Sequence, residues 1–134
     1  MGVYLGIDFG DKRVGLALSD PEKKLARRFM TLENSPRLMA ELEEKIKSEN
    51  VEKIIMGIPL AAKGETEQTK KVRRFISDFE KGVDVPIEGM NEIMTSKMAR
   101  ENLIGSGVKD VKAVLDQEAA RIILQDYMDF EKRE

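Results

Sequence analysis

The stretch that most constrains the fold is an almost wholly apolar run at residues 3–9, which reads VYLGIDF. Apolar residues fall on both sides of its two-residue period, which is typical of a central strand covered on both faces. The run contains one carboxylate, Asp8, at the edge of the core that such a strand would build. A charge at that place is costly unless a cation or several hydrogen-bond donors meet it. Asp8 therefore either caps the next turn or belongs to a functional site, and the stretch alone leaves both interpretations open.

The rest of the chain alternates between strand and helix patterns. Residues 13–19 follow a tight turn and form a hairpin with the first strand, and residues 25–32 predict a third, edge-like strand. Ser35 and Pro36 are typical of a helix start, and the helix is expected to run to about Ser48. The later elements are a buried parallel strand at 53–58, a helix at 65–81, a peripheral strand at 83–87 around Pro86, a helix at 95–103, and a final helix from about Asp116 to Phe130.

This order predicts an α/β fold with one five-stranded mixed sheet and helices on both of its faces. Three strands form an antiparallel meander, and the first of them lies in the middle beside the parallel strand at 53–58. We expect residues 1–134 to form a single domain, because their number suits one hydrophobic core.

The residue types that the chain lacks restrict its chemistry. The sequence contains no Cys and no His, which excludes disulfides, thiolate nucleophiles, Ser-His-Asp catalysis and the usual zinc sites. An enzyme of this composition must use carboxylates, Lys, Arg, hydroxyls or a hard metal held by oxygen. The formal charge of −2 means that local patches must hold any polyanion. With neither a signal peptide nor a membrane-spanning run, we expect a cytoplasmic protein.

Three carboxylates occupy comparable places in the predicted fold. Asp8 ends the central strand, Glu92 follows the last strand, and Asp116 begins the final helix. The carboxyl ends of parallel strands share one edge of a sheet, and Asp116 joins them if its helix crosses the sheet. Grouped carboxylates repel one another unless divalent metal ions bind them, and paired ions can activate water for phosphodiester hydrolysis. Locally, Asp116 also suits a helix N-cap, and Glu92 also suits a solvated loop.

Basic residues lie near the same predicted edge. Lys12 and Arg13 occupy the turn after Asp8, and a second group spans the loop and helix after the strand at 53–58: Lys63, Lys70, Arg73 and Arg74. These side chains are suited to holding phosphates, whereas a solvated helix face is the alternative for each of them taken singly. Aromatic residues are scarce, which argues against sequence-specific recognition of single strands.

Four blocks together resemble the YqgF family, which is related to the RuvC resolvases. They are GIDFGDKRVG at 6–15, GIPL at 57–60, Asn91-Glu92-Ile93-x-Thr95, and LDxxAAxxILQ at 115–125. The resemblance implies an RNase H-like fold and a metal-dependent nuclease, linked in bacteria to maturation of the 5′ end of pre-16S ribosomal RNA. It implies that Asp8, Glu92 and Asp116 form the acidic trio, binding Mg²⁺ or Mn²⁺. The blocks come in the family's order and span nearly the whole chain.

The sequence departs from the family pattern next to Glu92 and in the final helix. Asn91 and Ile93 replace an Asp and an Arg, which removes a phosphate or transition-state contact. Ala119 stands where resolvase relatives can carry a second Asp, which weakens that part of a metal site.

Several functions stay open at this stage. The family resemblance favours cleavage of structured RNA, with a Holliday junction resolvase-type DNA nuclease as the alternative. A nucleic-acid-binding or assembly factor without catalysis fits the altered flank of Glu92. An ATPase is a further alternative, because residues 8–12 resemble the first phosphate loop of actin-like ATPases, but those proteins need two such domains. We expect a monomer or weak homodimer.

Overall fold

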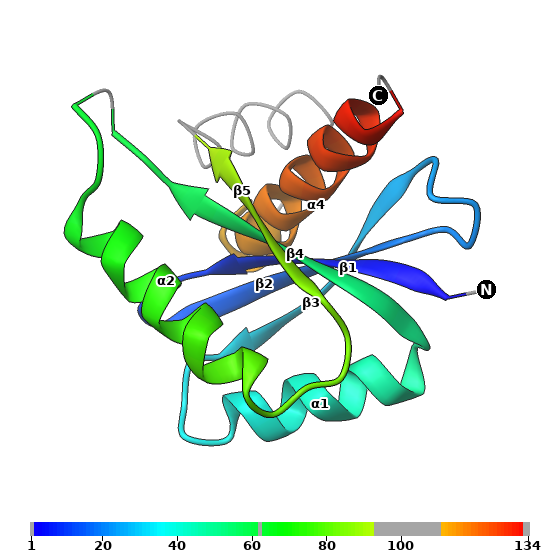
Figure 1. Ribbon diagram of the computed structural model, residues 1–134, viewed down its shortest axis with the longest axis horizontal. Coiled ribbons are helices and arrows are strands. Elements are labelled where there is room, and N and C mark those ends of the chain that lie inside the picture. Colours follow the sequence, from blue (N-terminus) through cyan, green and yellow to red (C-terminus); the bar gives the residue numbers. More distant parts are fainter. Residues whose placement is uncertain (1, 62, 93–110, 133–134) are drawn as a thin grey trace.

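The computed structural model describes residues 2–61, 63–92 and 111–132, and they contain a five-stranded mixed sheet in the order β3-β2-β1-β4-β5 (Figure 1). β1, β2 and β3 form an antiparallel meander, and β4 and β5 run parallel to β1. The prediction of a central first strand beside a parallel strand is confirmed. The strands are β1 (Val3–Phe9), β2 (Arg13–Ser19), β3 (Ala26–Glu33), β4 (Val51–Pro59) and β5 (Ile87–Glu92).

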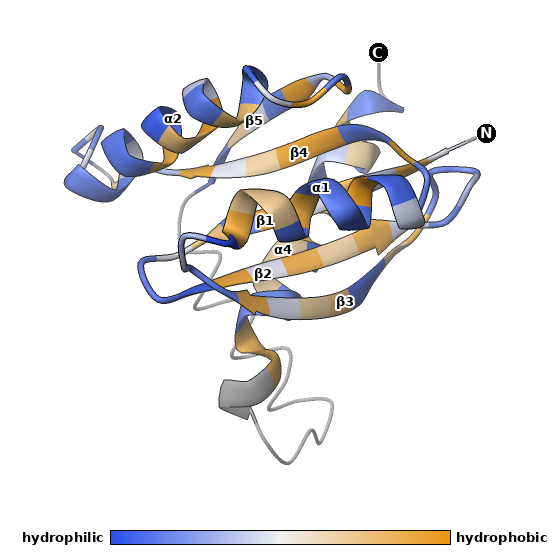
Figure 2. Ribbon diagram, turned by 90° about the horizontal axis from the view of Figure 1, so that it is seen from below, coloured by the Kyte–Doolittle hydropathy of each residue, from blue (hydrophilic) through white to orange (hydrophobic). Residues whose placement is uncertain are grey.

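Helices cover both faces of the sheet, as predicted. α1 (Leu38–Ser48) and α2 (Glu67–Glu80) pack on one face, and α4 (Val111–Glu131) crosses the other (Figures 1 and 2). The apolar side chains divide accordingly into two clusters, which is why β1 must be apolar on both sides. No helix in the described ranges is both long and apolar enough to cross a membrane.

Three predicted boundaries were wrong. α1 begins at Leu38 rather than at Pro36, because Ser35 to Arg37 form a turn in which the Ser35 side chain accepts a bond from the Arg37 amide. The last strand begins at Ile87, after Pro86, and its residues pair with β4 from Ile87 opposite Ile54 to Glu92 opposite Pro59. Glu92 is consequently the final residue of β5 and not a loop residue. The helix predicted at 95–103 lies outside the described residues.

α4 also begins earlier than predicted, at Val111, so Asp116 lies inside the helix and is not its N-cap. The backbone of α4 at Asp116 lies directly against Gly15 of β2, where a methyl group would overlap the Asp116 carbonyl. At Gly6 of β1, a methyl group would lie 2.8 Å from Leu124 Cβ and 2.9 Å from the Ala120 carbonyl oxygen. Both glycines therefore let α4 approach the middle of the sheet closely.

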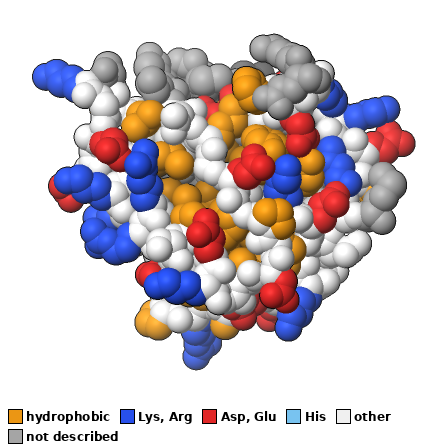
Figure 3. Space-filling model, viewed as in Figure 1, with side chains coloured by type: hydrophobic (Ala, Val, Ile, Leu, Met, Phe, Trp, Pro, Cys, Tyr) orange, Lys and Arg blue, Asp and Glu red, His pale blue; other side chains and the backbone are white. Residues whose placement is uncertain are grey.

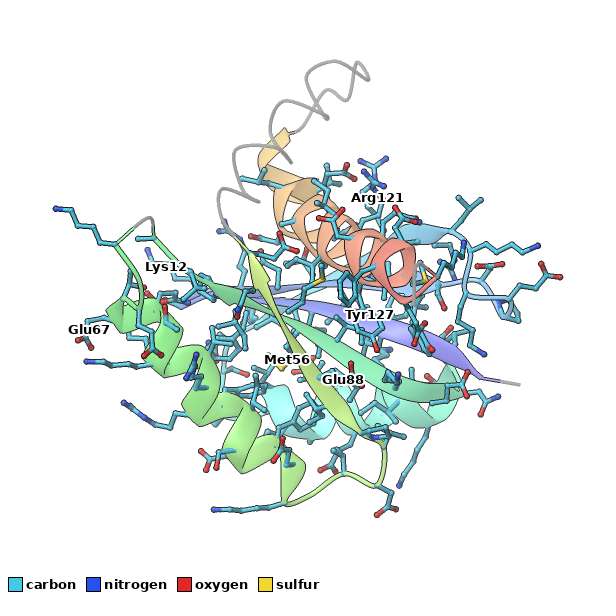
Figure 4. The ribbon with its side chains drawn as sticks, turned by 45° about the horizontal axis from the view of Figure 1, so that its top comes forward. Lys12, Met56, Glu67, Glu88, Arg121 and Tyr127 are labelled. Atoms are coloured by element: carbon cyan, nitrogen blue, oxygen red, sulfur yellow. The ribbon has the colours of Figure 1, made fainter. Side chains whose placement is uncertain are left out.

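The other end of α4 is held by a polar network. Tyr127 donates a 2.6 Å hydrogen bond to Glu88 of β5, and both residues are labelled in Figure 4. Lys53 of β4 donates a 3.0 Å bond to the Tyr127 hydroxyl. Burial, together with the bond to Glu88, raises the pKa of Tyr127 to about 12. Lys53 also lies over the rings of Tyr4 and Tyr127, at 5.2 and 5.3 Å from their centroids. α4 is thus fixed across the sheet at both ends.

We expect Gly15→Ala to lower the free energy of unfolding by at least about 2 kcal/mol, because the added methyl group meets backbone atoms that cannot move independently. Gly82→Ala is the matched control, since its methyl group would meet only the flexible Glu43 side chain at 3.2 Å and the Phe79 carbonyl at 4.0 Å. Urea denaturation followed by circular dichroism measures both variants. Equal midpoints for Gly15→Ala and wild type would contradict the close contact.

Candidate functional site

Two of the predicted carboxylates meet at the carboxyl end of β1. Asp8 pairs with Gly15 in the β1–β2 ladder, and Asp116 lies against the same Gly15 from α4. Asp8 shares its sheet face with Gly6, which α4 also contacts, so the Asp8 side chain points toward α4. Burial, and then repulsion by the Asp116 carboxylate, raises the pKa of Asp8 to about 7.

Arg13 neutralises only one member of this pair. Its Nε atom donates a 2.8 Å hydrogen bond to Oδ2 of Asp116, and this bond raises the pKa of Arg13. The Arg13 side chain is 54% exposed and that of Asp116 is 20% exposed, so the ion pair is largely open to solvent. Such a pair contributes little to stability and can rearrange at small cost. Asp8 has no cation in a comparable position among the described residues.

Glu92 lies on the same face of the sheet but farther from the pair. The alternation of β5 through Glu88, which contacts α4, directs Glu92 to the α4 side. There it lines a hollow with Asp126, Asp129 and Phe130, near the carboxyl-terminal end of α4. Among residues 2–61, 63–92 and 111–132, no three acidic side chains are grouped closely enough to hold one metal ion. The structure therefore brings Asp8 and Asp116 together, without Glu92.

The side chains of the predicted phosphate-binding cations are exposed, and some of them form ion pairs. Lys70 lies 3.5 Å from Glu67, and Arg73 lies 3.2 Å from Glu65. Figure 3 shows blue and red side chains interspersed on the left of the view, where Figure 1 places α2. The cations that form no ion pair within the described part of the chain are Lys12, Lys63 and Arg74. Lys12 lies beside the amino-terminal part of α2 (Figure 4).

Sequence reasoning missed the contacts that hold the edge of the sheet around Asp8. Gln68 of α2 donates a 3.2 Å bond to the Phe9 carbonyl, and Thr69 donates to the Pro59 carbonyl. Asn34 donates a 2.7 Å bond to the Gly10 carbonyl, and Lys71 lies 3.2 Å from Asp11. The Thr66-x-x-Thr69 pattern signals a helix start, but these contacts join segments that are distant in sequence.

The Asp8–Asp116 pair fits a hard divalent cation. Both donors are carboxylate oxygens, and Mg²⁺ is commonly bound by one or two carboxylates together with water and substrate phosphates. The raised pKa of Asp8 reflects an uncompensated negative charge, which a cation would relieve. The absence of His and Cys from the whole chain also favours oxygen ligands.

Comparisons of the sequence with known proteins find relatives along nearly the whole chain. Residues 2–130 match the family described as "RuvX: Holliday junction resolvase". A "Putative pre-16S rRNA nuclease" of Maridesulfovibrio salexigens is 41% identical over 92% of this chain and 96% of its own length. A protein of the same name from Chloroflexus aurantiacus is 34% identical over 95% of this chain and 86% of its own length.

Two solved structures share the fold at low sequence identity. RuvC of T. thermophilus, in complex with a Holliday junction substrate, aligns with a TM-score of 0.59 and 20% identity, over 98% of this chain and 96% of that chain. The fowlpox virus resolvase in complex with junction DNA aligns with a TM-score of 0.57 and 11% identity, over 96% and 98%. The predicted RNase H-like, RuvC-related fold is thereby confirmed.

Stability without metal should fall as pH rises through the titration of Asp8. The native state keeps this proton up to about pH 7, whereas the unfolded chain releases it near its ordinary pKa of 3.8. The native state thus binds more protons between these values, and the free energy of unfolding falls by up to about 4 kcal/mol across the window. We expect Asp8→Asn to lack this component when urea denaturation is measured with EDTA at pH 4.5 and 7.5. The same loss in both proteins would contradict the assignment.

Proposed function

Because the chain belongs to the RuvX family, which its sequence motifs indicated under the name YqgF, we propose that it is a nuclease hydrolysing phosphodiester bonds of structured RNA. Its substrate in this proposal is pre-16S ribosomal RNA, after which its relatives are named. The cleavage takes place at the 5′ end of that RNA, as the resemblance to the YqgF family implies. Such a role belongs in the cytoplasm and needs only this one domain. The observation that carries the proposal is the meeting of Asp8 and Asp116 at the end of β1, in a chain without His.

In the proposed centre, Asp8 and Asp116 hold Mg²⁺ or Mn²⁺ through their carboxylates. The bound ion supplies an activated water and neutralises charge that develops on the phosphate. Asp8 must give up its proton to serve as a ligand, which ties metal binding to pH. Asp8 holds its carboxylate at the end of β1, while Asp116, whose side chain is 20% exposed, approaches from α4.

Arg13 has two successive partners in this proposal. Without metal, it neutralises Asp116 through the 2.8 Å hydrogen bond. When Asp116 serves as a ligand instead, the guanidinium is released at the same edge, where it can bind a substrate phosphate in bidentate fashion. Lys12, which is exposed beside it, adds a second cation for the nucleic acid backbone.

Glu92 is proposed as the third acidic residue of the centre. It shares the sheet face and the strand-end edge of Asp8, although its position is on β5, two strands away. Its carboxylate would therefore face a metal ion or a water molecule bound beside the Asp8–Asp116 pair. Because Asn91 and Ile93 replace the family's Asp and Arg on either side, the chain must supply its phosphate contacts elsewhere. Lys63, Lys70, Arg73 and Arg74 are the proposed candidates.

Branched DNA is the second candidate substrate. It is favoured by the description of the matching family and by the two structurally similar resolvases, which were solved with Holliday junctions. Matched assays on a pre-16S RNA fragment and on a synthetic four-way junction separate the two activities. Tight RNA binding that is indifferent to metal, without cleavage of either substrate, would instead support a non-catalytic assembly factor.

We expect Asp8→Asn and Asp116→Asn each to lower Mg²⁺-dependent cleavage of the preferred substrate by at least about 100-fold, because each removes a proposed metal ligand. Asp84→Asn is the matched control: Asp84 is exposed, lies at the other end of the sheet, and should retain wild-type activity. Cleavage is measured on end-labelled substrate with Mg²⁺ and with EDTA. Wild-type rates in Asp8→Asn would refute the metal centre.

A further inference from the structure

A hollow of about 370 Å³ lies on the opposite side of the sheet edge from Asp8, between the β1–β2 turn and α2. Two aromatic side chains, Phe9 and Phe75, form its apolar part. We call it the Phe9–Phe75 hollow, and its polar lining consists of Asp11, Asn34, Lys71, Arg74 and Asp78. The proposed metal centre uses none of these residues.

The aromatic part of the hollow is adjacent in sequence to the candidate active site. Phe9 follows Asp8 directly, so their side chains leave β1 on opposite faces of the same strand end. The rings of Phe9 and Phe75 are stacked, with centroids 4.4 Å apart and an angle of 30° between their planes. Both side chains retain partial solvent exposure. A nucleic acid strand crossing the end of β1 would therefore meet Asp8 on one side and an aromatic surface on the other.

Arg74 is the cation of this region that stays available for a ligand. Its neighbours on α2 are paired: Lys70 with Glu67, Lys71 with Asp11, and Arg73 with Glu65. Arg74 forms no ion pair with any residue in the described ranges, although it lines the hollow. An unpaired guanidinium beside aromatic rings is the combination that binds the phosphate and base of a single-stranded nucleotide.

The remaining lining residues suit the same ligand. The Asn34 side chain donates to the Gly10 carbonyl, which holds its amide at the edge of the hollow. Asp11 is neutralised by Lys71 at 3.2 Å, so it does not repel a phosphate as a free carboxylate would. Asp78, one turn after Arg74 on α2, offers acceptors to the amino groups of a base.

We propose that the Phe9–Phe75 hollow binds one unpaired nucleotide of the RNA substrate, with the base against the aromatic rings and its phosphate on Arg74. The proposal rests on the proposed nuclease function and deepens it. The enzyme would then select substrates in which the cleaved strand has an unpaired nucleotide beside the scissile bond. Stacking makes this preference one for single-stranded structure rather than for a particular base.

The test uses two RNA hairpins that differ only in a short single-stranded tail, the first tail base being 2-aminopurine. Binding is measured by fluorescence anisotropy with EDTA, so that cleavage does not interfere. We expect the wild type to bind the tailed hairpin about tenfold more tightly than the blunt one, and to quench the 2-aminopurine. Phe75→Leu, which keeps an apolar side chain, should lose most of the quenching and of the tail preference.

Arg74→Gln and Arg27→Gln form a matched pair, because both remove one positive charge from an exposed arginine side chain. Only Arg74→Gln should weaken binding of the tailed hairpin, by about tenfold, since Arg27 lies on β3 and does not line the hollow. Both side chains are exposed, so neither variant should change the thermal unfolding curve.

Equal affinity for the two hairpins, unchanged quenching in Phe75→Leu, or equal effects of the two Arg variants would each overturn the nucleotide site. If the wild type still cleaves RNA with Mg²⁺ in that event, the proposed function survives without the hollow. Absence of both RNA binding and cleavage would refute the two proposals together.

Discussion

The arrangement of the candidate site depends on the contact between the backbone of α4 and Gly15 of β2. Any side chain at Gly15 would overlap the Asp116 carbonyl, so only glycine allows α4 to lie this close to the sheet. Gly15 is also the β-ladder partner of Asp8. One close contact thus brings carboxylates from the two ends of the sequence together at the sheet edge. The Lys53–Tyr127–Glu88 network fixes the far end of the helix and prevents it from turning away.

The electrostatic character of the site follows from this packing. Two carboxylates are held near one another, but Arg13 compensates only Asp116. Asp8, enclosed by the sheet and α4, instead keeps its proton up to about pH 7. An enclosed carboxylate without a compensating cation is costly to stability. Its place at the end of the central strand is understandable if a cation binds there, and this is why the pair carries the functional proposal.

The fold could be predicted from sequence because its signals are local: a continuous apolar run in β1, apolar alternation in β2, and helical spacing in α2. The site could be predicted only in part. Asp116 looked like a helix start because aspartate is a common N-cap, whereas the helix already begins at Val111. Glu92 was expected just past the last strand, because Pro86 made the extent of that strand hard to predict. It is the last residue of β5, since the pairing with β4 runs from Ile87 to Glu92. The stacking of Phe9 on Phe75 joins two distant segments and has no local signal.

The proposed function depends on Asp8 and Asp116 together forming the metal-binding centre. Anomalous diffraction from crystals soaked in Mn²⁺ at pH 8 would locate the ion directly. We expect an anomalous peak within coordinating distance of both carboxylates, with Arg13 displaced from Asp116. A peak confined to the hollow lined by Glu92, Asp126 and Asp129, or no peak near Asp8 at millimolar Mn²⁺, would contradict it.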